Sequence, residues 1–414
     1  MERASGVYAK CSMITYKEAL KKILEHSQLL KVGSVPLREG LGRILGKDIV
    51  APEPFPSFDN SAVDGYAISV PSHMREGKKI KLKVQGEIRA GQRFKGFLKP
   101  GHAIRIFTGA SVPKGTQAVA MQEHVERVNG HIFLSKKPER EDNIRFRGED
   151  FQKGKILARR NTLLAPTHLA LLAAVGCEKI PVRPSPKVAI LATGSELLAV
   201  GEKLMQGKIR DSNTILLEAL VKEVGGISFS FSSVGDDPKK IRSWIQKGLN
   251  SDMLLISGGV SVGKYDFVKE ILKQEGVKEI FWKVNIKPGK PLFFGKKNQT
   301  LVFGLPGNPV SVFVTFEEFV KPAIFRMEGK VQQEDKWIKG YLTKPFRNGS
   351  RFHFVRVRCH RKKTGYTITP LKGQGSHMIG SLACANALLR VEANANLKKN
   401  ACVSVKLIGK EKRQ

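Results

Sequence analysis

The sequence predicts a multidomain α/β protein: a domain built on a parallel sheet, a β-rich domain, a helical and elongated domain, and a small C-terminal β-barrel. Three observations predict this fold class. The chain has 414 residues, 41% of them hydrophobic, which suffices for about two to four domains with cores of their own. Between Pro186 and about residue 325, strand-like and helix-like segments alternate. Short β-branched runs separated by turns fill residues 53–142 and return beyond residue 330.

The N-terminal part is predicted to begin with a helix. Residues 1–12 are expected to be a disordered leader, with Met13 as an alternative start. Residues 15–30 place apolar side chains at helical spacing, and Thr15 is the expected N-cap. In the β-rich segment, the runs IKLKVQGEI, HAIRIFTGA and HIFLS are predicted strands. Helical spacing returns in NTLLAPTHLALLAAVG, where Pro166 stands near the helix start.

A predicted linker, PVRPSPK at 181–187, precedes the α/β segment. Its predicted strands are KVAILATG, SDMLLISGG and the first part of TLVFGLPGNPVSVFVTFEEFV, whose second part is a predicted helix. The other predicted helices are TILLEALVKEVGG, DPKKIRSWIQKGL and YDFVKEILKQEG. Near-continuous apolar strands indicate a parallel sheet covered by helices on both faces. After residue 330, RFHFVRVRC, GYTITP, ALLRVE and CVSVKLI predict strands of a small β-barrel or sandwich.

The charge balance is unusual, because 71 Lys and Arg oppose 37 Asp and Glu, a formal net charge of +34. Such a charge is typical of proteins that bind nucleic acid or another polyanion, or it reflects a general bias toward basic surfaces. The basic residues are dispersed and form no basic helix, so we favour the second interpretation and expect no nucleic-acid partner. Five scattered cysteines without a CxxC pair favour neither a zinc ribbon nor disulfides. Without a long apolar run, a cytoplasmic protein with no membrane segment is expected.

Three predicted strands end in turns that contain glycine, in the runs LATGSELL, ISGGVSVGKYD and FGLPGNPVS. Ligands of doubly wound sheets bind beyond the carboxyl ends of the strands. Glycine lets the backbone approach a ligand, and successive N–H groups then bind an anion. One such turn is weak support for a site, but three in one domain favour a nucleotide or another phosphate-bearing ligand. The predicted substrate- and nucleotide-binding residues, with one nearby lysine, are Thr193, Gly194, Glu196, Ser257, Gly258, Gly259, Ser261, Gly263, Lys283, Pro306, Gly307 and Asn308.

The run WKVNIKPGKPLFFG carries Lys283, Lys287 and Lys290 beside two prolines that stiffen the turn. Lysines on a fixed loop favour an anion-binding role over ordinary surface lysines.

Acidic residues follow the predicted strands as well: Glu196, Asp211, Asp236, Asp237 and Asp266. Carboxylate oxygens beside phosphates suit Mg²⁺. Helix capping is the alternative for Asp211 and for the aspartates that precede Pro238, and the residues alone leave both interpretations open.

The N-terminal half has its own polar stretches. In PFPSFDNSAVDGYAI, Asp59 and Asp64 flank a turn that is either an Asx-type turn or a site acting on a metal or a proton. RIFTGASVPKG places Thr108 after a strand, and NIRFRGEDF combines two arginines with Glu149 and Asp150. Arginines next to carboxylates are usually structural ion pairs, so spacing alone does not decide.

Together these motifs resemble the MoeA/gephyrin E-domain family, the molybdopterin molybdenumtransferases. PFPSFDNSAVDGYAI, RIFTGASVPKGTQAVAMQE, IRFRGEDF, TGSEL, SGGVSVGKYD, IKPGKPLFFG and GLPGNPVS occur here in the family's order, and the resemblance runs from about Met13 to the end. It implies a magnesium-dependent insertion of molybdate into adenylylated molybdopterin, with release of AMP, in molybdenum cofactor biosynthesis. It also implies an elongated homodimer with the site in a cleft between subunits, a sheet domain of the molybdopterin-binding type, and molybdopterin adenylyltransferase as a further partner.

The resemblance also implies the domain boundaries. The elongated domain is expected to be discontinuous, and the expected ranges are 13–52 with 143–183 for that domain, 53–142 for the β-rich domain, 184–330 for the α/β domain and 331–414 for the barrel.

Site residues are carried over position by position. The predicted catalytic residues are Asp64, Thr108, Asp150, Lys287 and Lys290. The predicted molybdate ligands are Lys287, Lys290, Ser311, Arg356 and Ser376, and the predicted magnesium ligands are Glu196, Asp237 and Asp266. One departure affects the metal, because many family members carry aspartate where this chain has Ser195.

Two alternative functions remain at this point. One is a related molybdopterin adenylyltransferase-type enzyme, against which the DNSAVDGYA and RIFTG motifs argue. The other is a scaffold or interaction member of the family with degenerate catalysis, which an intact set of motifs disfavours without excluding.

Overall fold

The computed structural model describes residues 13–72, 79–231, 235, 237–259, 267–330, 336–363 and 365–408. The chain divides into two compact units. The first comprises Met1–Ser34, Gly42–Gly46 and Pro181–Gln414, and the second comprises Val35–Leu41 and Lys47–Ile180. No helix among the described residues is long and apolar enough to cross a membrane. The predicted leader and the candidate residues Ser261, Gly263, Asp236 and Asp266 lie outside the described ranges.

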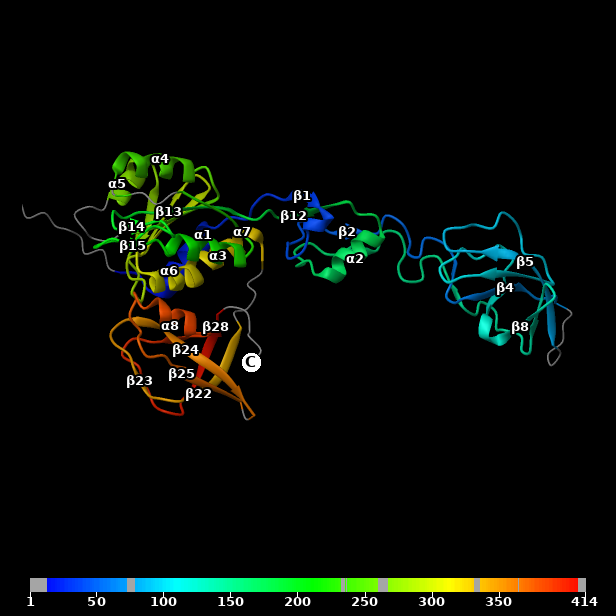
Figure 1. Cartoon of the computed structure of the whole chain (residues 1–414). Helices are drawn as coiled ribbons and strands as arrows, with labels where there is room; N and C mark the ends of the chain where they lie inside the picture. Colours follow the sequence, from blue (N-terminus) through cyan, green and yellow to red (C-terminus); the bar gives the residue numbers. More distant parts are fainter. Residues whose placement is uncertain are drawn as a thin grey trace, which may run out of the picture. The chain divides into compact units, whose positions relative to one another are not determined.

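The first unit is built on a six-stranded sheet with the order β16-β13-β17-β21-β20-β18. Strand β13 of this sheet is labelled in Figure 1. Its four parallel strands are β13 (Lys187–Ala192), β16 (Ile227–Ser230), β17 (Met253–Ser257) and β21 (Thr300–Leu305). The apolar runs predicted β13, β17 and β21, whereas β16 was not among the predicted strands. The last two strands are β20 (Phe293–Lys297) and β18 (Lys278–Trp282). Strand β20 is antiparallel to both of its neighbours, so β18 has the same direction as β21. Two residues, Asn298 and Gln299, separate β20 from β21, and a connection so short only reverses the chain. The sheet is therefore mixed and not wholly parallel.

Helices cover both faces of this sheet. Along β17, Leu255 packs into a cluster with Leu217 and Phe303, whereas Leu254 and Ile256 pack into a second cluster. This alternation is what a strand buried on both faces requires. The helices of the unit are α1 (Tyr16–His26), α3 (Asn213–Glu223), α4 (Pro238–Gly248), α5 (Phe267–Gln274), α6 (Pro309–Thr315), α7 (Lys321–Glu328) and α8 (Ile379–Cys384). A π-helical segment, η3 (Phe316–Val320), joins α6 to α7, and the small strands β14 (Leu197–Leu198) and β15 (Ile209–Arg210) pair in parallel.

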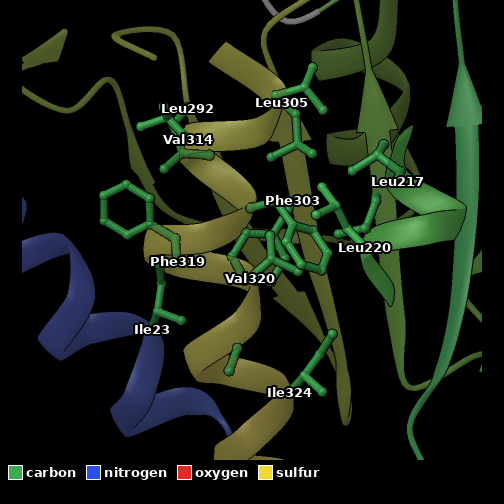
Figure 2. Packing of buried hydrophobic residues seen from close by; sticks show 14 of the residues in the cluster. Ile23, Leu217, Leu220, Leu292, Phe303, Leu305, Val314, Phe319, Val320 and Ile324 are labelled. Atoms are coloured by element: carbon green, nitrogen blue, oxygen red, sulfur yellow. The ribbon is translucent and has the colours of Figure 1, made fainter. Parts of the chain in front are cut away.

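Helix α1 confirms the predicted N-terminal helix and its cap. Thr15 and Glu18 form a capping box, in which each side chain accepts a hydrogen bond from the other residue's backbone N–H. The helix ends at His26 and buries Ile23 in the same cluster as Phe319 and Val320 of η3 (Figure 2). This helix thus belongs to the core of the first unit, while the predicted boundaries of the discontinuous domain stay a prediction.

A closed β-barrel forms the C-terminal part of the first unit. Its strands are β22 (Trp337–Leu342), β24 (Phe352–Lys362), β25 (Gly365–Pro370), β26 (Ala387–Val391) and β28 (Cys402–Leu407). Strand β24 pairs with both β25 and β26, so the sheet closes on itself, and β19 (Ile286–Lys287) adds to β24 in parallel. The barrel encloses its own core, which includes Val355 and Ile368. A short pair, β23 (Phe346–Arg347) and β27 (Asn396–Leu397), lies beside it.

The second unit carries a six-stranded sheet with the order β7-β4-β6-β5-β9-β8. These strands are β4 (Gly65–Ser69), β5 (Ile80–Ile88), β6 (His102–Ile106), β7 (Ala118–Met121), β8 (Val125–Val128) and β9 (His131–Leu134), so the predicted run IKLKVQGEI is β5. Ile68 and Ala67 point into separate clusters on its two faces. The remaining short elements along the chain are β1 (Gly33–Pro36), η1 (Leu37–Glu39), β2 (Ile49–Val50), β3 (Asn60–Ser61), η2 (Gln122–His124), β10 (Ile144–Arg145), β11 (Ile156–Ala158), α2 (Pro166–Ala174) and β12 (Lys179–Val182).

Candidate functional site

Three turns meet at the carboxyl ends of β13, β17 and β21. The N–H of Thr193 donates to the carbonyl of Ser257 over 2.9 Å, and the N–H of Gly258 donates to the carbonyl of Leu305 over 3.2 Å. The glycine turns predicted from the sequence therefore lie side by side. This is the place at which a doubly wound sheet binds its ligand.

Two glycines of the middle turn are required by its geometry. Gly258 and Gly259 have φ angles of +89° and +63°. A Cβ atom on Gly258 would lie 2.3 Å from the carbonyl oxygen of Thr193, and one on Gly259 would lie 2.6 Å from Cγ2 of Val268. A side chain at either position would therefore push the turns apart.

Gly258→Ala is expected to lower the free energy of unfolding by about 1–3 kcal/mol and to weaken nucleotide binding, because both backbone strain and a backbone contact oppose the new Cβ. Gly207→Ala is the matched control, since Gly207 has a φ of +75° and nothing within 4 Å of the added atom. Urea unfolding and nucleotide titration of both variants check this expectation. Equal losses in both would show that the contact with Thr193 has no effect.

Asn213 joins the turn after β17 to the turn after β21, and it was not predicted as a site residue from the sequence. Its Nδ2 donates to Oγ of Ser257 over 2.9 Å and to the carbonyl of Gly307 over 2.7 Å. Its Oδ1 and the hydroxyl of Thr193 are buried, and neither has a partner among the described residues. A buried polar atom without a partner is costly, so these two atoms mark a place where a water molecule or a ligand completes the hydrogen bonding. An asparagine after an RDS run carries no sequence signal for this role.

Capping explains two of the predicted carboxylates. Oδ1 of Asp211 accepts hydrogen bonds from the N–H groups of Asn213 and Thr214, each over 3.0 Å. Asp237 is the N-cap of α4, and its Oδ1 accepts from the N–H of Lys239 over 2.9 Å. For both aspartates, the capping interpretation from the sequence is confirmed.

Among the described residues, no group of three His, Cys, Asp or Glu side chains could hold a metal ion. Asp266 lies outside these residues, so the predicted set of magnesium ligands stays a prediction. Glu196 is exposed after β13. A Cβ on Gly235 would lie 3.9 Å from Cα of Ser195, so the turn of Glu196 approaches the loop that precedes Asp237. Mg²⁺ is commonly held by one or two carboxylates together with substrate phosphates and water. Glu196 fits such a shared site, whereas a cage made of protein ligands alone does not fit the described residues.

The lysine loop packs its central residues against α6. Pro288 and Gly289 are buried, and a Cβ on Gly289 would lie 2.7 Å from Cγ2 of Thr315 in α6. Lys287 and Lys290, which flank this buried pair, are both exposed. The two lysines thus stand on a loop anchored against α6. Lys283 is engaged locally, with its Nζ 4.1 Å from the centroid of the Trp282 ring.

Arg356 is a fully buried cation with unused donors. Its Nη2 donates to the carbonyls of Gly373 and Gly375 over 2.8 and 3.1 Å. Its Nε and Nη1 are buried and have no partner among the described residues, and burial lowers the pKa of its guanidinium group. A buried positive charge is costly unless an anion pairs with it. The side chain is thus suited to bind an oxyanion.

The loop at residues 373–376, which Arg356 contacts, lies beside the start of α6. The Nδ2 atom of Asn308 donates to Oγ of Ser376 over 3.1 Å, and the N–H of Val310 donates to the carbonyl of Ser376 over 3.2 Å. Ser311 is buried in the first turn of α6. The structure therefore links Arg356, Ser376 and the start of α6 through the 373–376 loop. The predicted anion ligands come from separate parts of the first unit.

His353 lies under the lysine loop and is neutral at pH 7, because burial and the charges of Lys287, Arg356 and Arg351 lower its pKa to about 4. Its Nδ1 donates to Oδ1 of Asn348 over 3.1 Å. In the unfolded chain the histidine pKa is about 6.5, so the unfolded state takes up the proton more readily between these values.

We therefore expect the free energy of unfolding to fall by up to about 3 kcal/mol through His353 as the pH falls from 6.5 toward 4. Above pH 7, His353 should not change the free energy of unfolding with pH. Urea unfolding between pH 7 and 5 checks this, with His353→Gln as the comparison. The pH dependence of the variant should be shallower than that of the wild type. Parallel curves would contradict the burial of a neutral histidine.

In the second unit, Asp64 and Thr108 form a pair. Oδ1 of Asp64 accepts hydrogen bonds from the N–H of Thr108 over 2.8 Å and from its hydroxyl over 2.7 Å. These two bonds, with the charge of Arg105, hold the pKa of Asp64 below its usual value, so the carboxylate is ionised. A Cβ on Gly65 would lie 2.0 Å from the carbonyl oxygen of Ala120, which explains the glycine after Asp64.

The other polar residues of the second unit divide into structural and exposed groups. Asp59 accepts a hydrogen bond from the N–H of Arg147 over 2.7 Å, and Glu149 accepts one from the N–H of Phe146 over 2.8 Å. Asp150 is exposed, and its carbonyl oxygen accepts a hydrogen bond from Nζ of Lys155 over 3.4 Å. Asp64, Thr108 and Asp150 thus remain the candidates of this unit.

A cavity of about 300 Å³ lies away from these turns. It is lined by apolar residues such as Phe313 and Leu382, together with Glu223 and Glu317, and by none of the predicted site residues. The cavity therefore does not mark the candidate site.

Family descriptions match three consecutive parts of the chain. Residues 14–176 match "MoeA N-terminal region (domain I and II)", residues 189–326 match "Probable molybdopterin binding domain", and residues 339–408 match "MoeA C-terminal region (domain IV)".

Curated relatives cover most of the chain. A protein of Haemophilus influenzae named molybdopterin molybdenumtransferase is 35% identical over 386 residues, which span 92% of this chain and 95% of the relative. A Nostoc protein of the same name is 40% identical over 294 residues, covering 70% of this chain and 67% of the relative. These matches include both units.

Solved structures agree with these matches. The crystal structure of a molybdopterin biosynthesis MoeA protein from Pyrococcus horikoshii matches with a TM-score of 0.80 and 31% identity, covering 96% of this chain and 99% of that one. A molybdenum cofactor biosynthesis protein from Pyrococcus furiosus matches with a TM-score of 0.56 and 25% identity, over 96% of this chain and all of that one (100%).

Proposed function

The chain belongs to the MoeA family, and from that premise we propose that it is a molybdopterin molybdenumtransferase of molybdenum cofactor biosynthesis, which inserts molybdate into adenylylated molybdopterin and releases AMP. The proposed substrates are a dianion and a nucleotide-bearing pyrophosphate, which repel each other. A site that joins them needs fixed positive groups and backbone donors. The described site offers both.

The guanidinium of Arg356, whose Nε and Nη1 have no partner among the described residues, is the observation that carries this proposal. Its two unused donors, Nε and Nη1, form part of a planar fork that suits tetrahedral oxyanions. Lys287 and Lys290 stand on a rigid loop, and Ser376 contacts the start of α6. We assign molybdate to these groups, with Ser311 as a further ligand. Arg356 and the lysines would offset its charge as it approaches the pterin.

The turns after β13, β17 and β21 are the proposed nucleotide site. Their glycines leave the backbone open to a ligand, and Asn213 holds two of the turns together. Magnesium is proposed as the cofactor, with Glu196 as its described carboxylate and the substrate phosphates as further ligands. When bound there, the ion would stabilise the charge that develops as AMP leaves. Asp64, Thr108 and Asp150 are proposed to act on the substrate from the second unit.

The test uses purified protein with adenylylated molybdopterin, Mg²⁺ and molybdate. AMP release is measured together with the reconstitution of an apo-molybdoenzyme. Release that depends on molybdate and ends in active enzyme supports the proposal. If the nucleotide binds but AMP release does not depend on molybdate, the proposal is wrong.

We also propose that the protein is a homodimer in the cytoplasm, in keeping with the family resemblance. Light scattering of the full chain measures its mass directly, against 45.8 kDa for one chain. A mass of one chain at micromolar concentration would contradict the dimer.

A further inference from the structure

A buried ionic cluster lies at the contact between the π-helical segment η3 and the barrel. Glu318 is 1% exposed and accepts three hydrogen bonds. The donors are the hydroxyl of Tyr16 at 2.8 Å, Nη2 of Arg390 at 2.6 Å and Nζ of Lys406 at 3.2 Å. These partners come from α1, β26 and β28. One carboxylate of η3 therefore joins the N-terminal helix α1 to two strands of the C-terminal barrel.

Opposite charges surround the buried carboxylate of Glu318. Burial alone would raise the pKa of Glu318, but the charges of Lys406 and Arg390 and the hydrogen bonds from Tyr16 and Arg390 outweigh it and hold the pKa below its usual value. Lys406 is 2% exposed and also lies 3.5 Å from Glu317. Removing one partner of such a cluster leaves a buried charge uncompensated, which is strongly unfavourable. A shift of the barrel relative to η3 would break these ion pairs, so the cluster favours the observed position of the barrel.

The barrel strands that carry this cluster also carry Arg356. Arg356 of β24 is opposite Leu388 of β26, and Leu388 is opposite Lys406 of β28. Residues directly opposite each other project from the same face of a sheet, so Arg356 and Lys406 belong to one row on one face. Arg390 of β26 is opposite Phe354 of β24. Phe354 is two residues before Arg356, so Arg390 projects from this same face. The position of the Arg356 side chain thus follows the position of the Lys406 and Arg390 side chains.

The helical segment from α6 to η3 contacts the barrel at both of its ends. At its start, Asn308 and Val310 hold Ser376 through two hydrogen bonds. At η3, Glu318 holds Arg390 and Lys406. Between these two contacts the barrel packs its apolar side chains, including Phe354 and Leu388, into the core of the unit. The π-helical form of η3 is of the kind that often occurs at functional sites.

We propose that Glu318 is a positioning residue for the oxyanion: it seats the barrel on η3 so that Arg356 and Ser376 stay at the start of α6. This inference rests on the proposed function, because it assumes that Arg356 and Ser376 bind molybdate. Glu318 itself touches neither molybdate nor the nucleotide. Its loss should weaken oxyanion binding while nucleotide binding at the sheet turns is unchanged.

The experiment titrates the full chain with molybdate alone, and separately with AMP, by calorimetry. Glu318→Gln is compared with Glu328→Gln, which changes another buried glutamate. Glu328 is the last residue of α7 and forms an ion pair with Lys330. We expect Glu318→Gln to weaken molybdate binding about tenfold or more and to leave AMP affinity within about twofold. Glu328→Gln should leave both affinities within about twofold of the wild type.

Tyr16→Phe provides a milder variant that keeps every charge and removes one hydrogen bond to Glu318. We expect it to weaken molybdate binding about threefold with a melting temperature close to that of the wild type. The inference is wrong if Tyr16→Phe and Glu318→Gln bind molybdate as the wild type does. It is also wrong if Glu328→Gln weakens molybdate binding as much as Glu318→Gln does. A wild type that binds AMP but no molybdate would instead overturn the proposed oxyanion site, and the inference with it.

Discussion

Arg356→Ala is expected to lower kcat/KM for molybdate by about 10²- to 10³-fold, the range found when one donor of a preorganised oxyanion site is removed. The reason is structural as well as electrostatic. The guanidinium group donates to the carbonyls of Gly373 and Gly375, and it also presents two unused donors. Alanine removes the positive charge, the donors and the support of the loop that carries Ser376. Steady-state AMP release at varied molybdate concentration measures the effect.

Arg356→Lys separates charge from geometry. Lysine keeps a positive charge but offers a compact ammonium group in place of the planar fork. We expect it to recover only a small part of the lost activity, because a single ammonium nitrogen on a shorter side chain cannot place donors at the separate positions of Nε, Nη1 and Nη2. Circular dichroism should show that both variants are folded. Wild-type kcat/KM in folded Arg356→Ala would contradict the assignment of this residue to the oxyanion.

Much of the fold could be predicted, because its strands and helices follow local patterns. The run IKLKVQGEI became β5, and Thr15 caps α1 as its sequence context indicates. The reversed direction of β20 in the main sheet could not be predicted from apolar content. It depends on the two-residue connection at Asn298, and the run KKNQT does not have the usual glycine of a hairpin.

The candidate site was predicted only in part, for a physical reason. Glycines that must adopt positive φ are visible as glycines, so the turn at Gly258 could be found. The role of Asn213 depends on two partners that are 44 and 94 residues away. The contact of Tyr16 with Glu318 spans 302 residues. No local pattern reports such distant pairs, and a buried lysine or glutamate looks in the sequence like any surface charge.

Capping is the second source of difficulty. Asp237 follows a predicted strand and precedes Pro238, and both a metal ligand and a helix cap fit that description. The hydrogen bond from the N–H of Lys239 shows the cap, whereas the role of Asp237 as a metal ligand stays a prediction. Asp64 was equally ambiguous from the sequence. Its hydrogen bonds come from a residue 44 positions away and not from the next turn of a helix.

Asp64→Asn is the second variant for which we expect a large loss, a decrease of about 10²-fold or more in kcat with little change in stability. Asparagine has nearly the same shape, and its Oδ1 still accepts from the N–H and the hydroxyl of Thr108. The substitution therefore removes the negative charge and leaves the local hydrogen bonds in place. A loss of activity in a protein with the same melting temperature would assign the function to the charge.

Thr108→Val tests the same pair from the other side. Valine removes the hydroxyl donor but keeps the backbone N–H, so the pKa of Asp64 should rise toward its ordinary value, and the carboxylate stays ionised at pH 7. We therefore expect Thr108→Val to lose less activity at neutral pH than Asp64→Asn, and to lose more as the assay is made acidic. If both variants kept wild-type kcat, the pair would serve only to hold the residue before β4 to the loop after β6. If Thr108→Val were the more damaging at neutral pH, the hydroxyl itself, and not the charge of Asp64, would be the group that acts on the substrate.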